Sequence, residues 1–208
     1  MAGSAEIEDS SEEKGAFVDS RTWDTLVSSM KGTYGTGVGE GAVPKPVIMP
    51  LVRGELVGLI WLRPVEPGAD ALTGIAALSN IAAAAGADEV VLAWESRDVS
   101  TVCGLPSAGP VPCLNMVHAT PEGHVLHQFP YDEKLSAPEG EGEAATVGIE
   151  WKAPPAPQEG GDLVAPVRAA VDYAFTPMDM DHPNPFGVTV VLMEEDGYTV
   201  RLTESLDR

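Results

Sequence analysis

The sequence predicts a mixed α/β (α+β) fold, in which helices pack on a mixed β-sheet. Short apolar runs rich in Val, Leu and Ile recur at 47–52, 89–94 and 188–193, which is typical of buried strands. Segments of helical character lie between these runs, and Gly, Pro and Asp mark the turns. A chain of 208 residues buries about 70% of the surface of its unfolded form, so the predicted core needs no disulfide or metal.

Acidic side chains far outnumber basic ones. The chain has 32 Asp and Glu against 12 Lys and Arg, a formal net charge of −20 at pH 7. Because neutralising phosphates requires Lys and Arg, this balance argues against direct nucleic-acid binding and against binding to anionic membranes. It favours a protein partner with a basic surface.

Residues 1–15 are rich in Ser and Glu and predict a disordered acidic arm. They lack the basic start and apolar run of a secretory signal. The charge-free stretch at 71–87 is too short and too weakly apolar to predict a membrane span. We therefore expect a cytoplasmic protein in which Cys103 and Cys113 are reduced.

Residues 16–46 predict a short helix followed by a linker. Ser20 is the expected cap of this helix, and Gly32 is its expected end. Segment 32–41 contains five glycines and predicts a flexible linker. It lacks the Gly-Lys-Ser/Thr ending of a phosphate-binding loop. The apolar stripe of the helix falls at i, i+3, i+4 and i+7: Trp23, Leu26, Val27 and Met30.

Residues 47–130 predict a first α/β unit. Its strand–helix–strand order predicts a right-handed parallel crossover. The expected elements are a hairpin around Arg53-Gly54, a helix over 70–85, a strand over 89–94, a loop over 98–112, and a second hairpin of 114–120 with 124–129.

Residues 131–208 predict a second α/β unit packed on the first. Pro166 is compatible with the first turn of its helix, where backbone N–H groups have no helical partner. The expected elements are a mobile loop over 132–145, a strand over 146–152, a helix over 162–175, and a closing hairpin of 188–193 with 198–203 around Asp196-Gly197.

The two units share a short sequence pattern, which leads to the hypothesis of an internal duplication. Segments 57–64 and 147–154 have Val, Gly, Trp and Pro in the same register. Asp70 opens the expected helix after the first segment, and Asp162 opens the one after the second. In this hypothesis the chain contains two pseudo-repeated ββαββ units, and Trp61 and Trp151 are equivalent.

Three of the four histidines lie in the second hairpin. If Glu122-Gly123 forms the turn, His118 and His127 are directly opposed, with Cβ atoms about 5 Å apart. Two imidazoles at this separation are close enough to bind one metal ion, for which zinc is the natural candidate. The expected third ligand is one of three residues in the C-terminal part of the chain: Asp179, Asp181 or His182.

No established catalytic motif accompanies these residues. The sequence has neither a His-Glu-x-x-His zinc motif nor a Gly-x-Ser-x-Gly elbow, and neither cysteine has basic neighbours that would activate it. We therefore expect a non-catalytic interaction or accessory protein, similar in character to an inhibitor or immunity protein, that binds a basic partner and needs no cofactor. Two alternatives remain open: a metal-dependent hydrolase built on His118, His127, Asp181 and His182, and a DNA mimic.

Overall fold

The computed structural model describes residues 18–42, 44–106, 111–136 and 146–203, so the predicted arm at 1–15 lies outside the described residues. The fold is mixed α+β, as predicted. Its strands form one sheet in the order β7-β6-β5-β4-β1-β3-β9, with β2 paired to β1 and β8 paired to β6. The strands are β1 (Val47–Val52), β2 (Glu55–Leu56), β3 (Gly58–Trp61), β4 (Glu89–Glu95), β5 (Cys113–Thr120), β6 (Gly123–Ser136), β7 (Thr146–Trp151), β8 (Gln158–Glu159) and β9 (Thr199–Leu202).

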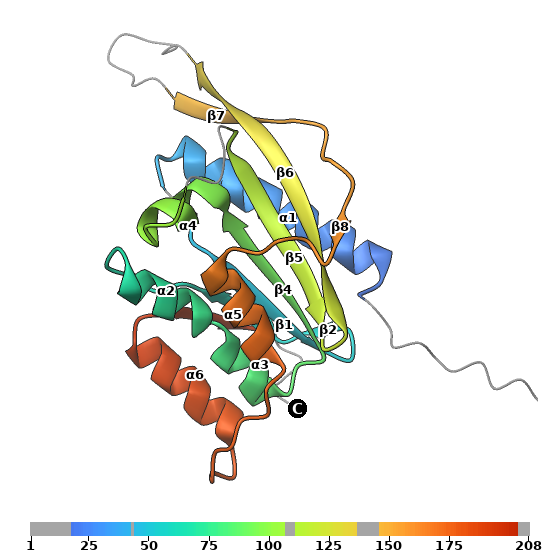
Figure 1. The fold of residues 1–208 in the computed structure, drawn as a ribbon, viewed down its shortest axis with the longest axis vertical. Helices are drawn as coiled ribbons and strands as arrows, with labels where there is room; N and C mark the ends of the chain where they lie inside the picture. The colour runs from blue at the N-terminus through green and yellow to red at the C-terminus, as the bar shows by residue number, and fades with distance from the viewer. Residues whose placement is uncertain (1–17, 43, 107–110, 137–145, 204–208) are drawn as a thin grey trace, which may run out of the picture.

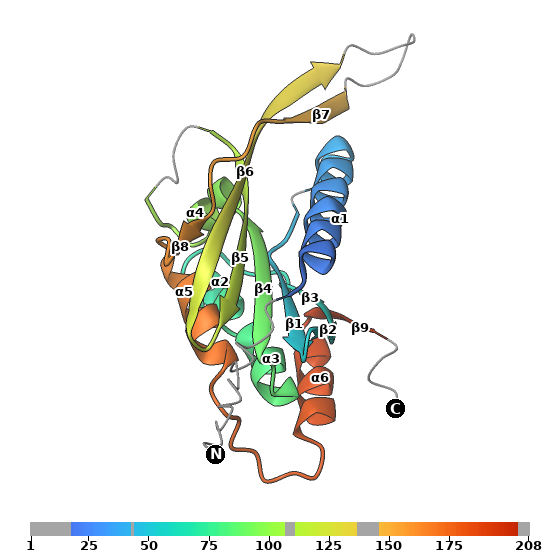
Figure 2. The same ribbon diagram turned by 90° about the vertical axis from the view of Figure 1, so that its right-hand side faces the viewer.

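The sheet separates two layers of helices. One face carries α1 alone, and the other face carries the remaining helices (Figures 1 and 2). Each face has its own apolar cluster, centred on Met49 and Met116 below α1 and on Ile48 and Leu92 on the other side. The helices are α1 (Ser20–Gly39), α2 (Ala69–Ala76), α3 (Ser79–Ala85), α4 (Ser96–Val102), α5 (Ala165–Ala174) and α6 (Pro185–Glu195).

Helix α1 is longer than the sequence predicts. It is capped by Asp19, whose carboxylate accepts from the N–H groups of Arg21 and Thr22, so the prediction of Ser20 as cap is wrong by one residue. The helix continues through Gly32 to Gly39, which corrects the predicted linker at 32–41. Although glycine costs helix stability, burial of Tyr34 against the sheet extends the apolar contact of α1 beyond Met30.

The first hairpin is confirmed. Arg53 and Gly54 both have positive φ, at 54° and 76°, as a type I′ turn requires. The N–H of Arg53 donates to the carboxylate of Asp88 at 2.9 and 3.0 Å, which fixes this turn against the start of β4.

The connection from β3 to β4 is a parallel crossover, as predicted, but it passes over β1. β3 and β4 lie on opposite sides of β1 and are both antiparallel to it. They therefore run in the same direction, joined through α2 and α3, although they do not pair with each other. Every strand pairing among the described residues is antiparallel, so the prediction of a mixed sheet is wrong. The helix predicted over 70–85 is divided into α2 and α3.

Two predicted loops contain regular structure. The segment expected as a loop from residue 98 begins inside α4, which Glu95 caps by accepting the N–H of Asp98 at 2.8 Å. The expected loop at 132–145 begins as strand, because β6 continues to Ser136 and pairs with β7 there. The rest of that loop, 137–145, lies outside the described residues.

The predicted C-terminal hairpin is wrong. Residues 188–193 belong to α6, although they are rich in β-branched side chains. Asn184 caps this helix by accepting the N–H of Gly187 at 2.9 Å, and Pro185 occupies its first turn, where proline is well tolerated. Its contacts to the core come from side chains at helical spacing: Phe186, Thr189, Val190 and Met193.

One pair of segments that the duplication hypothesis treats as equivalent has different secondary structure in the two units. The run at 89–94 is strand β4, whereas the matching run at 188–193 is helix. Trp61 and Trp151 both pack at the α1 face as half-buried side chains. The duplication itself stays a hypothesis.

Candidate functional site

The histidine hairpin forms in a different register from the one predicted. Thr120 pairs with Gly123, so the turn is Pro121-Glu122 and not Glu122-Gly123. His118 therefore pairs with Val125, and His127 pairs with Met116. The partner of His118 is therefore two positions away from the predicted one. Because side chains alternate along a strand, His118 and His127 still lie on the same face of the sheet, as diagonal neighbours. His124 lies on the opposite face, where its Nε2 is 2.8 Å from the carbonyl oxygen of Gly161.

His118 and His127 are engaged inside the protein. Nε2 of His118 lies 2.6 Å from Oε2 of Glu89, and both side chains are almost fully buried. The ring of Trp23 from α1 covers both imidazoles, with centroid distances of 5.9 Å to His118 and 4.3 Å to His127. Burial, assisted by the neighbouring His118, lowers the pKa of His127 below its ordinary value. These contacts give both histidines a packing role under α1.

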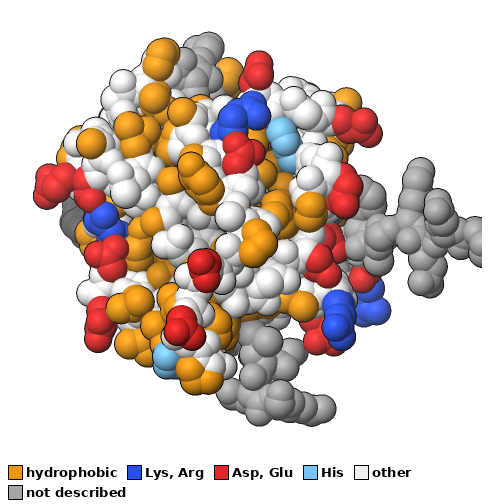
Figure 3. All heavy atoms as spheres, turned by 60° about the horizontal axis from the view of Figure 1, so that its bottom comes forward, with side chains coloured by type: hydrophobic (Ala, Val, Ile, Leu, Met, Phe, Trp, Pro, Cys, Tyr) orange, Lys and Arg blue, Asp and Glu red, His pale blue; other side chains and the backbone are white. Residues whose placement is uncertain are grey.

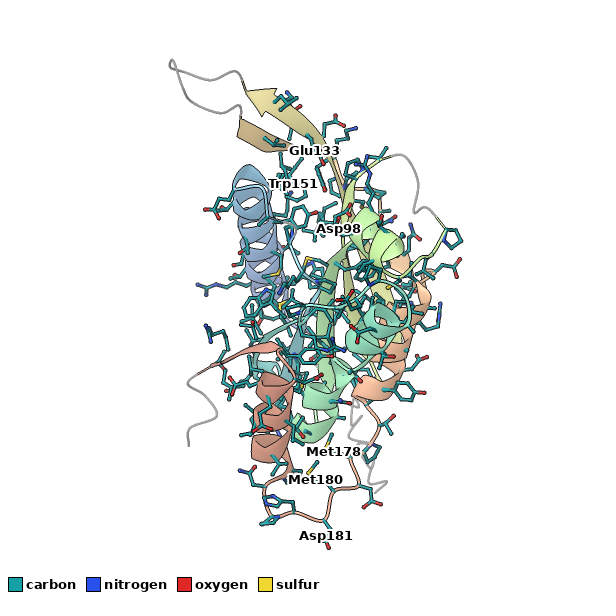
Figure 4. The ribbon with its side chains drawn as sticks, turned by 90° about the vertical axis from the view of Figure 1, so that its left-hand side faces the viewer. Asp98, Glu133, Trp151, Met178, Met180 and Asp181 are labelled. Carbon is teal, nitrogen blue, oxygen red and sulfur yellow. The ribbon has the colours of Figure 1, made fainter. Side chains whose placement is uncertain are left out.

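The other predicted metal ligands lie elsewhere. Asp181 and His182 are exposed in the connection between α5 and α6, and Figure 4 shows Asp181 in a loop at one end of the molecule. Nδ1 of His182 accepts the N–H of Asn184 at 3.0 Å. Within the described residues, no three His, Cys, Asp or Glu side chains are close enough to hold one metal ion. The structure therefore does not bring His118, His127, Asp181 and His182 together.

The cysteines also lack the features of a reactive site. Cys103 and Cys113 are both free and buried. Burial raises the pKa of both thiols, that of Cys113 to about 11, so thiolate is scarce near neutral pH.

A cluster of carboxylates lies at the opposite end of α1 from the histidines. We call it the acidic pocket, a cavity of about 250 Å³ between the C-terminal end of α1, the start of α4 and the β6–β7 ribbon. Figure 4 shows Asp98 and Glu133 at this end of the molecule. The lining residues are Tyr34, Val38, Gly41, Ala42, Pro44, Glu95, Arg97, Asp98, Tyr131, Glu133 and Val147.

Strand β4 places the first carboxylate of the pocket. Glu95 ends this strand and is only 2% exposed. Its two oxygens accept the N–H groups of Asp98 and Cys113, at 2.8 and 3.1 Å. These two hydrogen bonds hold the carboxylate in place, so its charge lies at the inner wall of the pocket.

Asp98 experiences this charge directly. Its pKa is raised to about 6, first by burial and then by repulsion from Glu95 and Glu133, while Arg97 offsets part of the effect. A carboxylate held in this way gains stability when a cation approaches it.

Two tyrosines form the aromatic wall of the acidic pocket. The hydroxyl groups of Tyr34 and Tyr131 are 3.0 Å apart and buried, and this hydrogen bond joins α1 to β6. Burial raises the pKa of both phenols, so both are protonated near neutral pH. The rings themselves lie 5.6 Å apart and are tilted by 57°.

Chemically, the acidic pocket is suited to binding. The described lining has no Ser, Thr, Cys, His or Lys side chain that could act as a nucleophile. It combines carboxylates with aromatic rings, the two kinds of group that hold an ammonium or guanidinium group.

The sequence patterns did not predict this pocket. The available signal was Glu95, an acidic residue that directly follows the apolar run of β4 and precedes another acidic residue, Asp98, by three positions. The convergence of Glu133 from β6 depends on the continuation of that strand beyond residue 131, which the composition of 132–145 did not indicate.

The acidic side chains on the face shown in Figure 3 are more dispersed. Figure 3 shows acidic side chains scattered among neutral and hydrophobic ones on the face turned toward the viewer. A DNA mimic requires acidic groups arrayed along one surface, and this face does not present such an array.

Comparison with known proteins adds no relative: no family model matches the chain, no curated protein matches it, and no solved structure matches it. Among the helices of the described residues, none is long and apolar enough to cross a membrane.

Proposed function

We propose that the chain is a non-catalytic binding protein that holds a basic side chain of a protein partner in the acidic pocket. The observation that carries this proposal is the raised pKa of Asp98, caused by burial together with Glu95 and Glu133. A Lys or Arg side chain entering the pocket replaces this repulsion with attraction. The net charge of −20 assists the approach of such a partner over longer distances.

The carboxylates give the pocket a preference among the basic residues. Arg forms paired hydrogen bonds with carboxylates, whereas Lys acts as a compact point charge. Asp98 and Glu133 therefore favour arginine as the inserted side chain, while Tyr34 and Tyr131 are almost fully buried and form a packed wall of the pocket. This assignment concerns recognition only and requires no metal or cofactor.

The test is calorimetric titration with two short peptides, acetyl-Ala-Leu-Arg-Leu-Ala-amide and the same peptide with citrulline in place of arginine. Citrulline keeps the shape of arginine but carries no charge. We expect the arginine peptide to bind about tenfold more tightly. The Asp98→Asn/Glu133→Gln variant should lose this preference.

A matched control distinguishes binding in the acidic pocket from general attraction to an acidic protein. The Glu194→Gln/Glu195→Gln variant removes the same charge from exposed positions of α6, far from the pocket. It should keep the wild-type preference at both 20 mM and 300 mM salt. Equal losses in the two double variants, or equal binding of the two peptides, would show that the acidic pocket is not the recognition site.

A further inference from the structure

A glycine lies beside the apolar stripe of α1, above the sheet. Leu26, Met30 and Tyr34 are buried at successive turns of the helix, and Val38 continues this spacing as a partly buried side chain of the same cluster. Gly37, next to Val38, has no side chain and lines a cavity. A Cβ atom built there would contact only a side-chain carbon of Pro44, at 3.4 Å.

The space below this part of α1 is a cavity of about 450 Å³, which we call the α1 cavity. It is distinct from the acidic pocket, although Tyr34, Pro44 and Glu95 contribute to both. Protein interiors are normally close-packed, and apolar hollows of this volume are typical of small-molecule sites. The apolar part of the lining comes from the helix, the segment after it and the sheet: Met30, Pro44, Val47, Trp61, Ala93 and Leu114.

The exposed residues at the edge of the α1 cavity are basic or hydroxylated. Lys45 and Arg201 are both exposed, as are Thr33 and Thr199. Within the described part of the chain, neither Lys45 nor Arg201 forms an ion pair. Two basic side chains at one opening are unusual for a protein in which acids outnumber bases by 32 to 12.

The acidic group of the α1 cavity is placed differently. Glu95 is 2% exposed, and both of its oxygens already accept backbone N–H groups. Both oxygens of Glu95 are therefore occupied by backbone donors at the inner wall, while the charges of Lys45 and Arg201 lie at the surface. The polarity of the opening favours an anionic head group.

We propose that the α1 cavity binds a small apolar carboxylic acid. The apolar part of the ligand lies between α1 and the sheet, below Gly37, and its carboxylate contacts Lys45 and Arg201 at the opening. The basic opening of this site is separate from the acidic pocket, with which the cavity shares Tyr34, Pro44 and Glu95, and the proposal does not rest on the basic partner proposed for that pocket.

The test uses three probes with the same ten-carbon chain: decanoate, decanol and decylammonium. Binding is measured by calorimetry below micelle-forming concentrations, with tryptophan fluorescence as a second readout because Trp61 lines the cavity. We expect decanoate to bind most tightly and decylammonium most weakly. Equal affinity for all three would overturn the proposal.

Two variants and one matched control show where the probes bind. Lys45→Gln/Arg201→Gln should weaken decanoate binding about tenfold and leave decanol unaffected, whereas Arg53→Gln/Arg168→Gln removes the same charge from other exposed positions and should change neither. Gly37→Leu should fill the cavity and weaken all apolar probes at least tenfold.

Folding of Gly37→Leu is checked by circular dichroism. If this variant is unfolded, the charge variants alone decide the proposal, because their side chains are exposed and their removal leaves the core intact. Unchanged decanoate binding in Lys45→Gln/Arg201→Gln contradicts the proposed site.

Discussion

The carboxylate of Glu89 lies 2.6 Å from Nε2 of His118, and the same oxygen accepts the N–H of Val18 at 2.8 Å. This arrangement connects the start of β4, the middle of β5 and the segment before α1. Since Trp23 covers His118 from the helix, the pair also forms part of the surface on which α1 packs. His118, which the sequence predicts as a metal ligand, thus anchors α1.

Removal of the imidazole in His118→Ala should lower the free energy of unfolding by about 3 kcal/mol, because the buried carboxylate of Glu89 loses its side-chain partner and keeps the N–H of Val18. Urea denaturation gives this value directly. Glu122→Ala, in the exposed turn of the same hairpin, should change it by less than about 0.5 kcal/mol. Replacement of both partners in Glu89→Leu/His118→Leu should recover most of the loss. A His118→Ala variant as stable as the wild type would contradict the anchoring role.

The Tyr34–Tyr131 hydrogen bond at the other end of α1 should behave as a coupled pair. Tyr34→Phe or Tyr131→Phe alone leaves one buried hydroxyl without its partner, and we expect each to cost about 1–2 kcal/mol. The double Phe variant should cost less than the sum of the two, because it removes both polar groups. A double-mutant cycle from urea denaturation measures this coupling. Strict additivity would mean that the hydroxyl groups act independently.

The register of the histidine hairpin explains how much the sequence could predict there. The alternation of apolar and polar residues places His118 and His127 on one face, and the structure confirms this. Alternation has a period of two, so it cannot distinguish registers that differ by two positions. The choice of Pro121-Glu122 as the turn decides which of these registers forms, and turn chemistry at Pro-Glu-Gly permits both.

A similar ambiguity accounts for the error in α6. The run 188–193 contains β-branched residues that favour strands, whereas Asn184 and Pro185 are typical of a helix start. The helical spacing of Phe186, Val190 and Met193 also favours a helix. It selects the helix over a strand only when the core below α6 is in place. The acidic pocket is a further case, because Glu95, Asp98 and Glu133 converge through tertiary packing that no local pattern indicates.

Asp98 should make stability depend on pH in a definite direction. Its pKa is about 6 in the folded protein and about 3.9 in the unfolded chain. The folded state therefore binds this proton more tightly, and the resulting stabilisation is complete below pH 4 and is lost as the pH rises through 6. Asp98→Asn removes the ionisation, so the variant should be about 1 kcal/mol more stable than the wild type at pH 7.5 and similar to it near pH 4. Urea midpoints for both proteins across this range provide the measurement; a difference that is constant with pH would contradict it.

Gly58 and Gly148, which recur in the segments compared for the internal duplication, should respond differently to substitution. A Cβ atom at Gly58 would lie 2.6 Å from the backbone oxygen of Arg201 in β9, whereas the nearest atom to a Cβ at Gly148 is the backbone oxygen of Lys134, at 3.9 Å. Gly58→Ala must therefore displace β9, and we expect a loss of about 2 kcal/mol or more. Gly148→Ala should be neutral or slightly stabilising, because alanine loses less backbone entropy on folding than glycine.

Urea denaturation of the two alanine variants tests this difference, and amide exchange at Val200 reports whether β9 is the strand released in Gly58→Ala. Gly148→Ala is the matched control, since it makes the same chemical change in a strand of the same sheet. If the two variants lose the same stability, the two glycines meet the same steric demand and the case for duplication becomes stronger. If only Gly58→Ala is destabilised and Val200 exchanges faster, then close packing of β3 against β9 requires Gly58, and the recurrence of glycine at 148 needs no common origin.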